Sequence, residues 1–139
     1  MKVIIINGPN LNLLKDRNIE IYGGESFDNF HLSLAKKFPN IKIDYYQSNI
    51  EGELINKMQE ASSGYHYIIL NAGGYTHTSV AIADCIEAIN TPVIEVHISN
   101  IYAREEFRHK SLLTAHCLGS IVGLGLDSYK LAVEHIIAR

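Results

Sequence analysis

"YIILNAGGYTHTSVAIADCIEAINTPVIEVHI", residues 67–98, contains two apolar segments on either side of an amphipathic one. Residues 67–70 are apolar throughout, which predicts a buried central strand, and residues 93–98 predict a second one. Residues 79–89 have apolar side chains at helical spacing and end before Pro92, so we expect a helix there. Its inward-facing residues are expected to be Val80, Ala83, Ile86 and Ile89. A strand, a helix and a strand in this order form a right-handed βαβ unit in a parallel sheet.

The rest of the chain continues this alternation of strands and helices. Residues 41–45 alternate apolar side chains with Lys42 and Asp44, which is typical of a strand exposed on one side at a sheet edge. Ser26 is a suitable N-cap for the helix that follows it. The other expected elements are a strand at 3–6, a long loop at 8–24, helices at 26–38, 54–61 and 128–138, a partly helical segment at 103–115, and a strand at 120–124. These elements predict an α/β three-layer sandwich with a five-stranded parallel sheet in the flavodoxin-like order 2-1-3-4-5, because the second strand lies at an edge.

Length and composition are those of a single globular domain. The chain has 139 residues, 47% of them hydrophobic and 19% charged, with a net charge of −3. We expect one catalytic or binding domain over residues 1–139. Charged residues form no block of one sign, which disfavours a nucleic acid or an anionic membrane as partner. The apolar start, residues 1–6, is too short for a signal peptide or a membrane span. Cys85 and Cys117 form no CxxC pattern, so two buried thiols in a cytoplasmic protein are favoured over a disulfide or a metal site.

Polar residues concentrate in three loops that the predicted topology brings together. In a parallel sheet of this order, ligands bind beyond the carboxyl ends of the strands, where the strand order reverses. The loops after the first, third and fourth strands, residues 8–24, 71–79 and 97–108, meet at that place. We therefore expect a ligand site built from these loops.

The first of these loops places Arg17 five residues before Tyr22, in a segment bounded by glycines. One interpretation is an ordinary surface loop with a solvated arginine and a packed tyrosine. The alternative is a lid that brings a phenol and a guanidinium together over a substrate. A free tyrosine has a pKa of about 10, and a nearby cation lowers that value, so the pair could supply a phenolate base.

The second loop contains a glycine pair, residues 73–74, that allows backbone to approach a ligand closely. Asn71 ends the preceding strand. His77 is either a polar loop residue or a ligand contact, and Asp84, farther along the helix, is either a solvated residue or a functional one. The candidate N-caps of that helix are Thr76, Thr78 and Ser79.

Glu95 and His97 are the least expected residues of the last buried strand. Side chains alternate along a strand, so both point to the same side, and burying them is costly unless each satisfies the other or a ligand. His97 lies at the carboxyl end of the strand, and Glu95 could orient its ring or hold it protonated. An edge strand with both side chains in water is the alternative. Arg104 and Arg108 are four residues apart and are expected to share a helix face; Glu105 could pair with one of them, with neither, or with a partner chain.

Several common site types are absent from the sequence. It contains neither GxxxxGKS/T nor GxGxxG, which argues against a P-loop and a dinucleotide-binding fingerprint. No lysine lies in a central apolar strand, so Schiff-base chemistry is disfavoured. A metal site built from His77, His97, Glu95 or Asp84 is an alternative, although their spacing matches no strong metal-binding pattern.

Six segments, in order and over essentially the whole chain, resemble the type II 3-dehydroquinate dehydratases. They are NGPNLNLL (7–14), the Arg17…Tyr22-Gly23 lid, QSNIEGELI (47–55), YTHTSVAIAD (75–84), EVHISNIYAREEFRH (95–109) and GLGLDSY (123–129). Three positions depart from the family pattern: Lys15 replaces a common glycine, and Ile19 and Ala72 replace frequent prolines. These departures concern the stiffness of the lid and the rate rather than the class of enzyme.

The resemblance implies trans elimination of water from 3-dehydroquinate, through an enolate, to give 3-dehydroshikimate. It implies Tyr22 as the base, acting as a phenolate, and Arg17 as the cation that lowers its pKa. It implies that Asn10 positions a water at the enolate oxygen. His97 is implied as the general acid for the leaving hydroxyl, with Glu95 holding its orientation.

The same resemblance implies the substrate contacts and the assembly of the family. It implies no cofactor and no metal, a cytoplasmic homo-oligomer in which trimers assemble into a dodecamer, and an Asp84 that serves the site of a neighbouring subunit. The implied substrate-binding residues are Asn71, His77, Asp84, Ile98, Ser99, Arg108 and, through its charge, Arg104. Two other functions stay open on the residues alone: a non-catalytic module that binds a small anion or a partner protein, and a metal-dependent hydrolase that uses His77 and His97.

Overall fold

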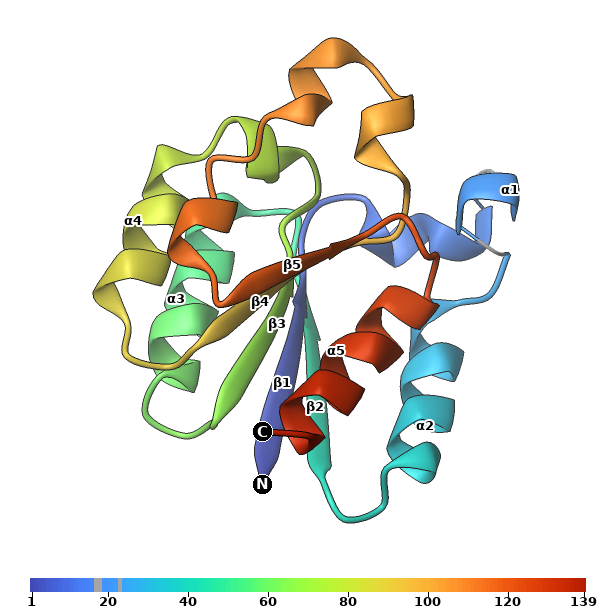
Figure 1. Ribbon diagram of the computed structural model, residues 1–139, viewed down its shortest axis with the longest axis vertical. Coiled ribbons are helices and arrows are strands. Elements are labelled where there is room, and N and C mark those ends of the chain that lie inside the picture. Colours follow the sequence, from blue (N-terminus) through green and yellow to red (C-terminus); the bar gives the residue numbers. More distant parts are fainter. Residues whose placement is uncertain (17–18, 23) are drawn as a thin grey trace.

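A five-stranded parallel sheet in the order β2-β1-β3-β4-β5 forms the centre of the protein, as predicted (Figure 1). The computed structural model describes residues 1–16, 19–22 and 24–139, with residues 21 and 22 as backbone alone. The strands are β1 (Lys2–Asn7), β2 (Lys42–Gln47), β3 (Tyr67–Asn71), β4 (Val93–His97) and β5 (Gly119–Val122).

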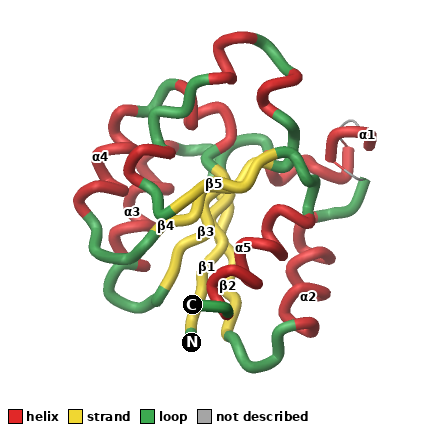
Figure 2. The backbone as a smooth tube through the Cα atoms, viewed as in Figure 1, coloured by secondary structure: helices red, strands yellow, loops and turns green. Residues whose placement is uncertain are grey.

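Helices cover both faces of the sheet, which gives the expected three layers (Figure 2). Helices α2 (Phe27–Lys37) and α5 (Asp127–Ile137) pack on one face, and α3 (Glu51–Ala61) and α4 (Val80–Ala88) on the other. The short helical turns are α1 (Ile19–Tyr22) and the 3-10 helices η1 (Leu11–Asp16), η2 (Gly73–His77), η3 (Ile101–Ala103), η4 (Glu106–His109) and η5 (Thr114–His116). None of the described helices has the length and apolarity needed to cross a membrane.

Strand β1 shows why the central strands read as continuous apolar runs. Val3 and Ile5 pack toward α2 and α5, whereas Ile4 and Ile6 pack toward α3 and α4. In a strand that is covered on both faces, every side chain is buried, so apolar residues follow one another without alternation. β2 is an edge strand, as its alternating sequence predicted.

Helix α4 begins at the predicted place, and Ala83, Ile86 and Ile89 face the core as predicted. The Ser79 hydroxyl is its N-cap and accepts a hydrogen bond of 2.9 Å from the Ile82 backbone N–H. The expectation that Val80 faces inward is wrong, since Val80 is 63% exposed. Val80 lies on the same side of the helix as the exposed Asp84, and Ile82 and Cys85 are buried in addition to the predicted Ala83 and Ile86.

Three further expectations about the elements need correction. The prediction of one long loop over residues 8–24 is wrong in part, because η1 and α1 lie within that range. Arg104 and Arg108 do not share a helix face, because η3 ends before Arg104 and η4 starts at Glu106. Cys85 is buried, but Cys117 is only partly buried, and both thiols are free.

Candidate active site

The loops after β1, β3 and β4 meet beyond the carboxyl ends of the strands and enclose a pocket. In Figure 1 the segment after β4, which runs through η3 and η4, rises above these strand ends. Most of the predicted site residues line this pocket: Asn10, Asn71, His77, His97, Ile98, Ser99, Arg104 and Arg108. Residues that are distant in sequence thus form one polar cavity at the switch point of the sheet.

Close packing of two loops forms the floor of the pocket. The Gly8 backbone N–H donates to the Asn71 carbonyl at 2.7 Å, and a Cβ atom at Gly8 would lie 2.6 Å from the Ala72 carbonyl oxygen. The next turn brings Asn10 into the left-handed region, with a φ of 69°, which asparagine tolerates. Its backbone N–H donates to Asn49 Oδ1 at 3.0 Å. Asn10 is therefore held at the pocket by its own backbone.

Beneath the floor, the side chain of Asn71 is held by a buried hydrogen-bond chain. Its Nδ2 donates to the Tyr129 hydroxyl at 2.8 Å, and that hydroxyl donates to Asn7 Oδ1, also at 2.8 Å. Burial raises the pKa of Tyr129, so its hydroxyl keeps its proton. The chain fixes the orientation of the Asn71 amide, whose Oδ1 accepts from the Gly73 backbone N–H at 3.2 Å.

Glu95 and His97 point to the same side of β4, as the alternation of the strand predicted. Glu95 Oε1 lies 2.7 Å from His97 Nε2, and the two residues are 0% and 5% exposed. The alternative of an edge strand is wrong, because β4 lies between β3 and β5. The Ser111 hydroxyl also donates to Glu95 Oε1 at 2.8 Å, and the Thr114 hydroxyl donates to Oε2.

These donors keep Glu95 ionised despite its burial. Burial alone would raise the pKa of Glu95, but hydrogen bonds from His97, Thr114 and Ser111 outweigh it, and the net pKa lies below the ordinary value. A carboxylate can only accept, so the His97 nitrogen that faces it carries a proton. Nδ1 of His97 is then the ring nitrogen left to exchange a proton with a molecule in the pocket.

His77 stands opposite His97, and the two rings use different nitrogens toward the protein: Nδ1 in His77 and Nε2 in His97. Its Nδ1 lies 2.8 Å from the Lys110 carbonyl oxygen, which can only accept, so Nδ1 carries the proton. The two imidazoles stack with centroids 6.4 Å apart. Burial lowers the pKa of His77, and the nearby His97 and Arg108 lower it further. A neutral His77 therefore offers Nε2 as an acceptor, for example for a ligand hydroxyl.

Two arginines give the outer wall of the pocket a positive charge. Arg104 Nη1 donates to the Ser99 hydroxyl at 3.2 Å. Arg108 Nε pairs with Glu105 Oε2 at 2.5 Å, and this hydrogen bond lowers the pKa of Glu105. Both guanidinium groups line the pocket although they come from separate turns. A pocket with two arginines and the amide of Asn71 suits a ligand with a carboxylate and hydroxyl groups.

Comparison with known proteins gives the family of the chain that forms this pocket. The family model for dehydroquinase class II matches residues 1–137. The chain belongs to the class II dehydroquinases. The 3-dehydroquinate dehydratase of Fusobacterium nucleatum is 52% identical over 143 residues, which cover 99% of this chain and 97% of that protein. That of Campylobacter jejuni is 51% identical over 139 residues, which cover 99% of this chain and 87% of that protein.

Solved structures agree with this family in fold. A type II dehydroquinase from Butyrivibrio crossotus superposes with a TM-score of 0.92 at 45% identity, and the match covers 99% of this chain and 97% of that one. The sheet order, the helical layers and the three loops described above are therefore those of a class II dehydroquinase.

Some predicted site residues of this dehydroquinase lie apart from the pocket. Glu95 lies behind His97, and Asp84 is exposed on α4. Arg17 and the side chain of Tyr22 lie outside the described residues. Among the residues that the structure describes, no group of three or more histidine, cysteine or acidic side chains could hold a metal ion.

Sequence reasoning missed the residues that support the site from behind. Tyr129, Ser111 and Thr114 touch Asn71 or Glu95 but do not line the pocket. Of these three residues, only Tyr129 belongs to a segment that carries the family resemblance, GLGLDSY, and the resemblance assigned no role to it.

Proposed function

We propose that this chain, as one catalytic domain of residues 1–139, dehydrates 3-dehydroquinate to 3-dehydroshikimate, as a hydro-lyase of the shikimate pathway or of quinate catabolism. The observation that carries the proposal is the buried Glu95–His97 pair, whose histidine faces a pocket with two arginines in a class II dehydroquinase. An acid backed by a carboxylate, next to a cationic wall, suits the loss of a hydroxyl group from an anionic substrate.

The first step removes a proton from the carbon next to the substrate ketone. Family resemblance supports Tyr22 as the base, with Arg17 stabilising its phenolate. The proton passes to the phenolate oxygen, and the electron pair of the broken C–H bond forms the enolate. Asn10, which lines the pocket, supports a water that donates to the enolate oxygen.

The second step expels the hydroxyl group. The enolate electrons re-form the ketone and make the new carbon–carbon double bond as the C–O bond breaks. In our proposal, His97 Nδ1 supplies the proton, so the hydroxyl leaves as water. The Glu95 carboxylate at Nε2 stabilises the positive charge of the ring before the transfer and fixes its plane.

The remaining pocket residues are proposed as substrate contacts. Ile98 and Ser99 follow β4 directly, where their backbone N–H groups suit the substrate carboxylate together with Asn71. His77 Nε2 suits a substrate hydroxyl, since its other nitrogen is bound to a carbonyl. Arg108 is proposed as a second hydroxyl or carboxylate contact, and Arg104 as part of the field that keeps Tyr22 ionised.

Assembly and location form a separate part of the proposal. Asp84 is exposed on α4 and is not among the residues that line the pocket described above, which supports a role in the site of a neighbouring subunit. We infer a dodecamer built from four trimers in the cytoplasm, on the resemblance to the family. A molar mass from light scattering of about twelve chains would support it, whereas a fully active monomer would contradict it.

Turnover is tested with 3-dehydroquinate and ultraviolet detection of the enone product. The wild-type protein is expected to form the enone, and no signal from folded protein would overturn the proposal in favour of a binding module. Tyr22→Phe should lose nearly all turnover while still binding substrate in calorimetry. His97→Ala should lower kcat about 100-fold or more, since general acids contribute about 10² to 10⁴; normal kinetics would remove His97 as the acid.

A further inference from the structure

We propose that Ser111 is a positioning residue of this enzyme: its hydroxyl locks Glu95 against His97 and ties that pair to the outer wall of the pocket. The inference rests on the proposed function, because the acid that it supports is His97. Ser111 itself does not line the pocket, so it acts through Glu95.

All of the hydrogen-bonding capacity of the Ser111 hydroxyl is used in a single arrangement. A hydroxyl has one proton to donate and two lone pairs. Ser111 Oγ accepts from the backbone N–H groups of Leu113 at 3.0 Å and Thr114 at 3.1 Å. Its proton is thus left for Glu95 Oε1, which lies 2.8 Å away. The hydroxyl cannot rotate to another partner without leaving a backbone N–H unpaired.

The turn formed by residues 110–114 supplies a donor to each oxygen of the Glu95 carboxylate. Oε1 accepts from Ser111 and from His97 Nε2, and Oε2 accepts from the Thr114 hydroxyl. A buried carboxylate with three donors has a fixed plane, and so has the imidazole that it faces. Loss of one donor would let the carboxylate turn away from His97.

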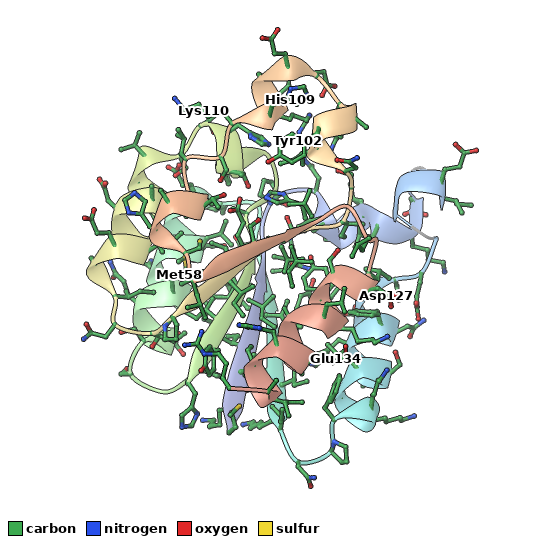
Figure 3. The ribbon with its side chains drawn as sticks, viewed as in Figure 1. Met58, Tyr102, His109, Lys110, Asp127 and Glu134 are labelled. Atoms are coloured by element: carbon green, nitrogen blue, oxygen red, sulfur yellow. The ribbon has the colours of Figure 1, made fainter. Side chains whose placement is uncertain are left out.

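The same turn connects the acid to the opposite histidine. The carbonyl of Lys110, the residue before Ser111, accepts from His77 Nδ1 at 2.8 Å. The next residue, Leu112, donates its backbone N–H to the Thr76 carbonyl at 2.9 Å. Residues 110–114 therefore position both imidazoles. Figure 3 shows Lys110 and His109 in the segment above the strand ends, at the start of this turn.

Charged and titratable groups around Glu95 define what a pH measurement would report. His97 contacts the carboxylate directly, His77 interacts with it across the pocket, and the Cys117 thiol faces it from the segment before β5. Burial and the Glu95 charge raise the pKa of Cys117 to about 12, so this thiol is neutral at working pH. A change in the pH profile therefore does not come from this thiol.

The test compares Ser111→Ala with Ser111→Thr, which keeps the hydroxyl, and with Ser48→Ala. Ser48 is a matched control, because its hydroxyl also donates to a glutamate, Glu53, and accepts a backbone N–H two residues ahead, from Ile50 at 3.0 Å. Steady-state kinetics with 3-dehydroquinate and the pH profile of kcat are measured for each. The rate at which the Nε2–H proton of His97 exchanges with solvent is followed by NMR with labelled histidine.

Ser111→Ala is expected to lower kcat about tenfold or more, with KM within about threefold, because it weakens an acid that contributes about 10² to 10⁴. Its pH profile should shift, its Nε2–H proton should exchange faster, and Ser111→Thr should restore both. Ser48→Ala should keep kcat within about twofold. An unchanged kcat in Ser111→Ala, or an equal loss in Ser111→Ala and Ser48→Ala, would overturn the inference.

Two further outcomes separate this inference from the proposed function. If the wild-type protein shows no turnover, the proposed function fails, and the exchange of the His97 Nε2–H proton alone decides whether Ser111 positions the pair. If Ser111→Ala does not fold, Thr114→Val takes its place, since it removes only the donor to the second oxygen at an exposed residue. The same fall in kcat is expected, and normal kcat would refute the positioning role.

Discussion

Replacing Tyr129 by phenylalanine would remove a single oxygen atom from a fully buried polar contact. Tyr129 is 0% exposed, and its hydroxyl joins Asn7 and Asn71 through two hydrogen bonds of 2.8 Å. Asn7 is 0% exposed, so no water can reach its side chain without rearrangement of the core, whereas Asn71 is 4% exposed and also lines the pocket. Asn7 Nδ2 already has no hydrogen-bond partner among the described residues, so one buried donor of this site is unsatisfied in the wild-type protein.

The size of the effect follows from the two partners that would be left. In Tyr129→Phe, Asn7 Oδ1 and Asn71 Nδ2 both lose their partner, and each unsatisfied buried group costs about 1–3 kcal/mol. The phenyl ring keeps its contacts with Phe27 and Phe30 on α2, so no packing is lost. We expect the free energy of unfolding to fall by about 2–4 kcal/mol, which lowers the melting temperature by about 10 °C for a domain of this size.

Urea unfolding at one fixed protein concentration measures this loss, because association would otherwise change the apparent stability. The matched control is Tyr67→Phe in β3. Tyr67 is partly buried against the same core cluster, and its hydroxyl has no hydrogen bond among the described residues. The control should stay within about 0.5 kcal/mol of wild type. A Tyr129→Phe protein as stable as the control would refute the reasoning, since the two asparagines would then be satisfied in another way.

Two further predictions concern the site loops and the buried acid. Gly8→Ala should destabilise the fold by several kcal/mol, as its Cβ would lie 2.6 Å from the backbone of Ala72, whereas Gly52→Ala on α3, with no atom within 4 Å, should be neutral or stabilising by about 0.5–1 kcal/mol; thermal melting of both proteins checks this. For Glu95, the folded pKa lies below the unfolded value of 4.5, so its contribution to stability is complete above pH 4.5 and is lost as pH falls through the folded pKa. The stability difference between wild type and Glu95→Gln, from urea titrations at pH 3 to 7, should therefore shrink below pH 4.5, and a constant difference would contradict this.

Much of the fold was predictable from local patterns. Strands that are buried on both faces have continuous apolar sequences. The alternation of apolar and polar side chains in β2 indicated an edge strand. The cost of burial also indicated the site, because Glu95 and His97 can be buried in a strand only if they satisfy each other or a ligand. Loops at the switch point then gathered most of the polar candidates into one pocket.

The features that the sequence did not predict depend on contacts between residues that are distant in the chain. Arg104 and Arg108 have helical spacing, but the segment breaks into separate 3-10 turns that pack over the strand ends. Tyr129 meets Asn7 across 122 positions of the chain, so no local pattern could show their bond. Val80 was assigned to the core because its apolarity fits helical spacing, and the true inward stripe is offset toward Ile82.

The two histidines of the pocket show how one residue type can take opposite roles. His77 donates from Nδ1 to a neutral carbonyl, and burial together with nearby positive groups lowers its pKa. His97 donates from Nε2 to a carboxylate that three hydrogen bonds keep ionised. A carboxylate attracts a cationic ring more strongly than a neutral carbonyl does, because it carries a full negative charge. Under the proposed function, His97 is thus the ring that can give a proton to a leaving hydroxyl, and His77 is the ring that can accept one from a substrate hydroxyl; exchanging the acceptors behind them would exchange these roles.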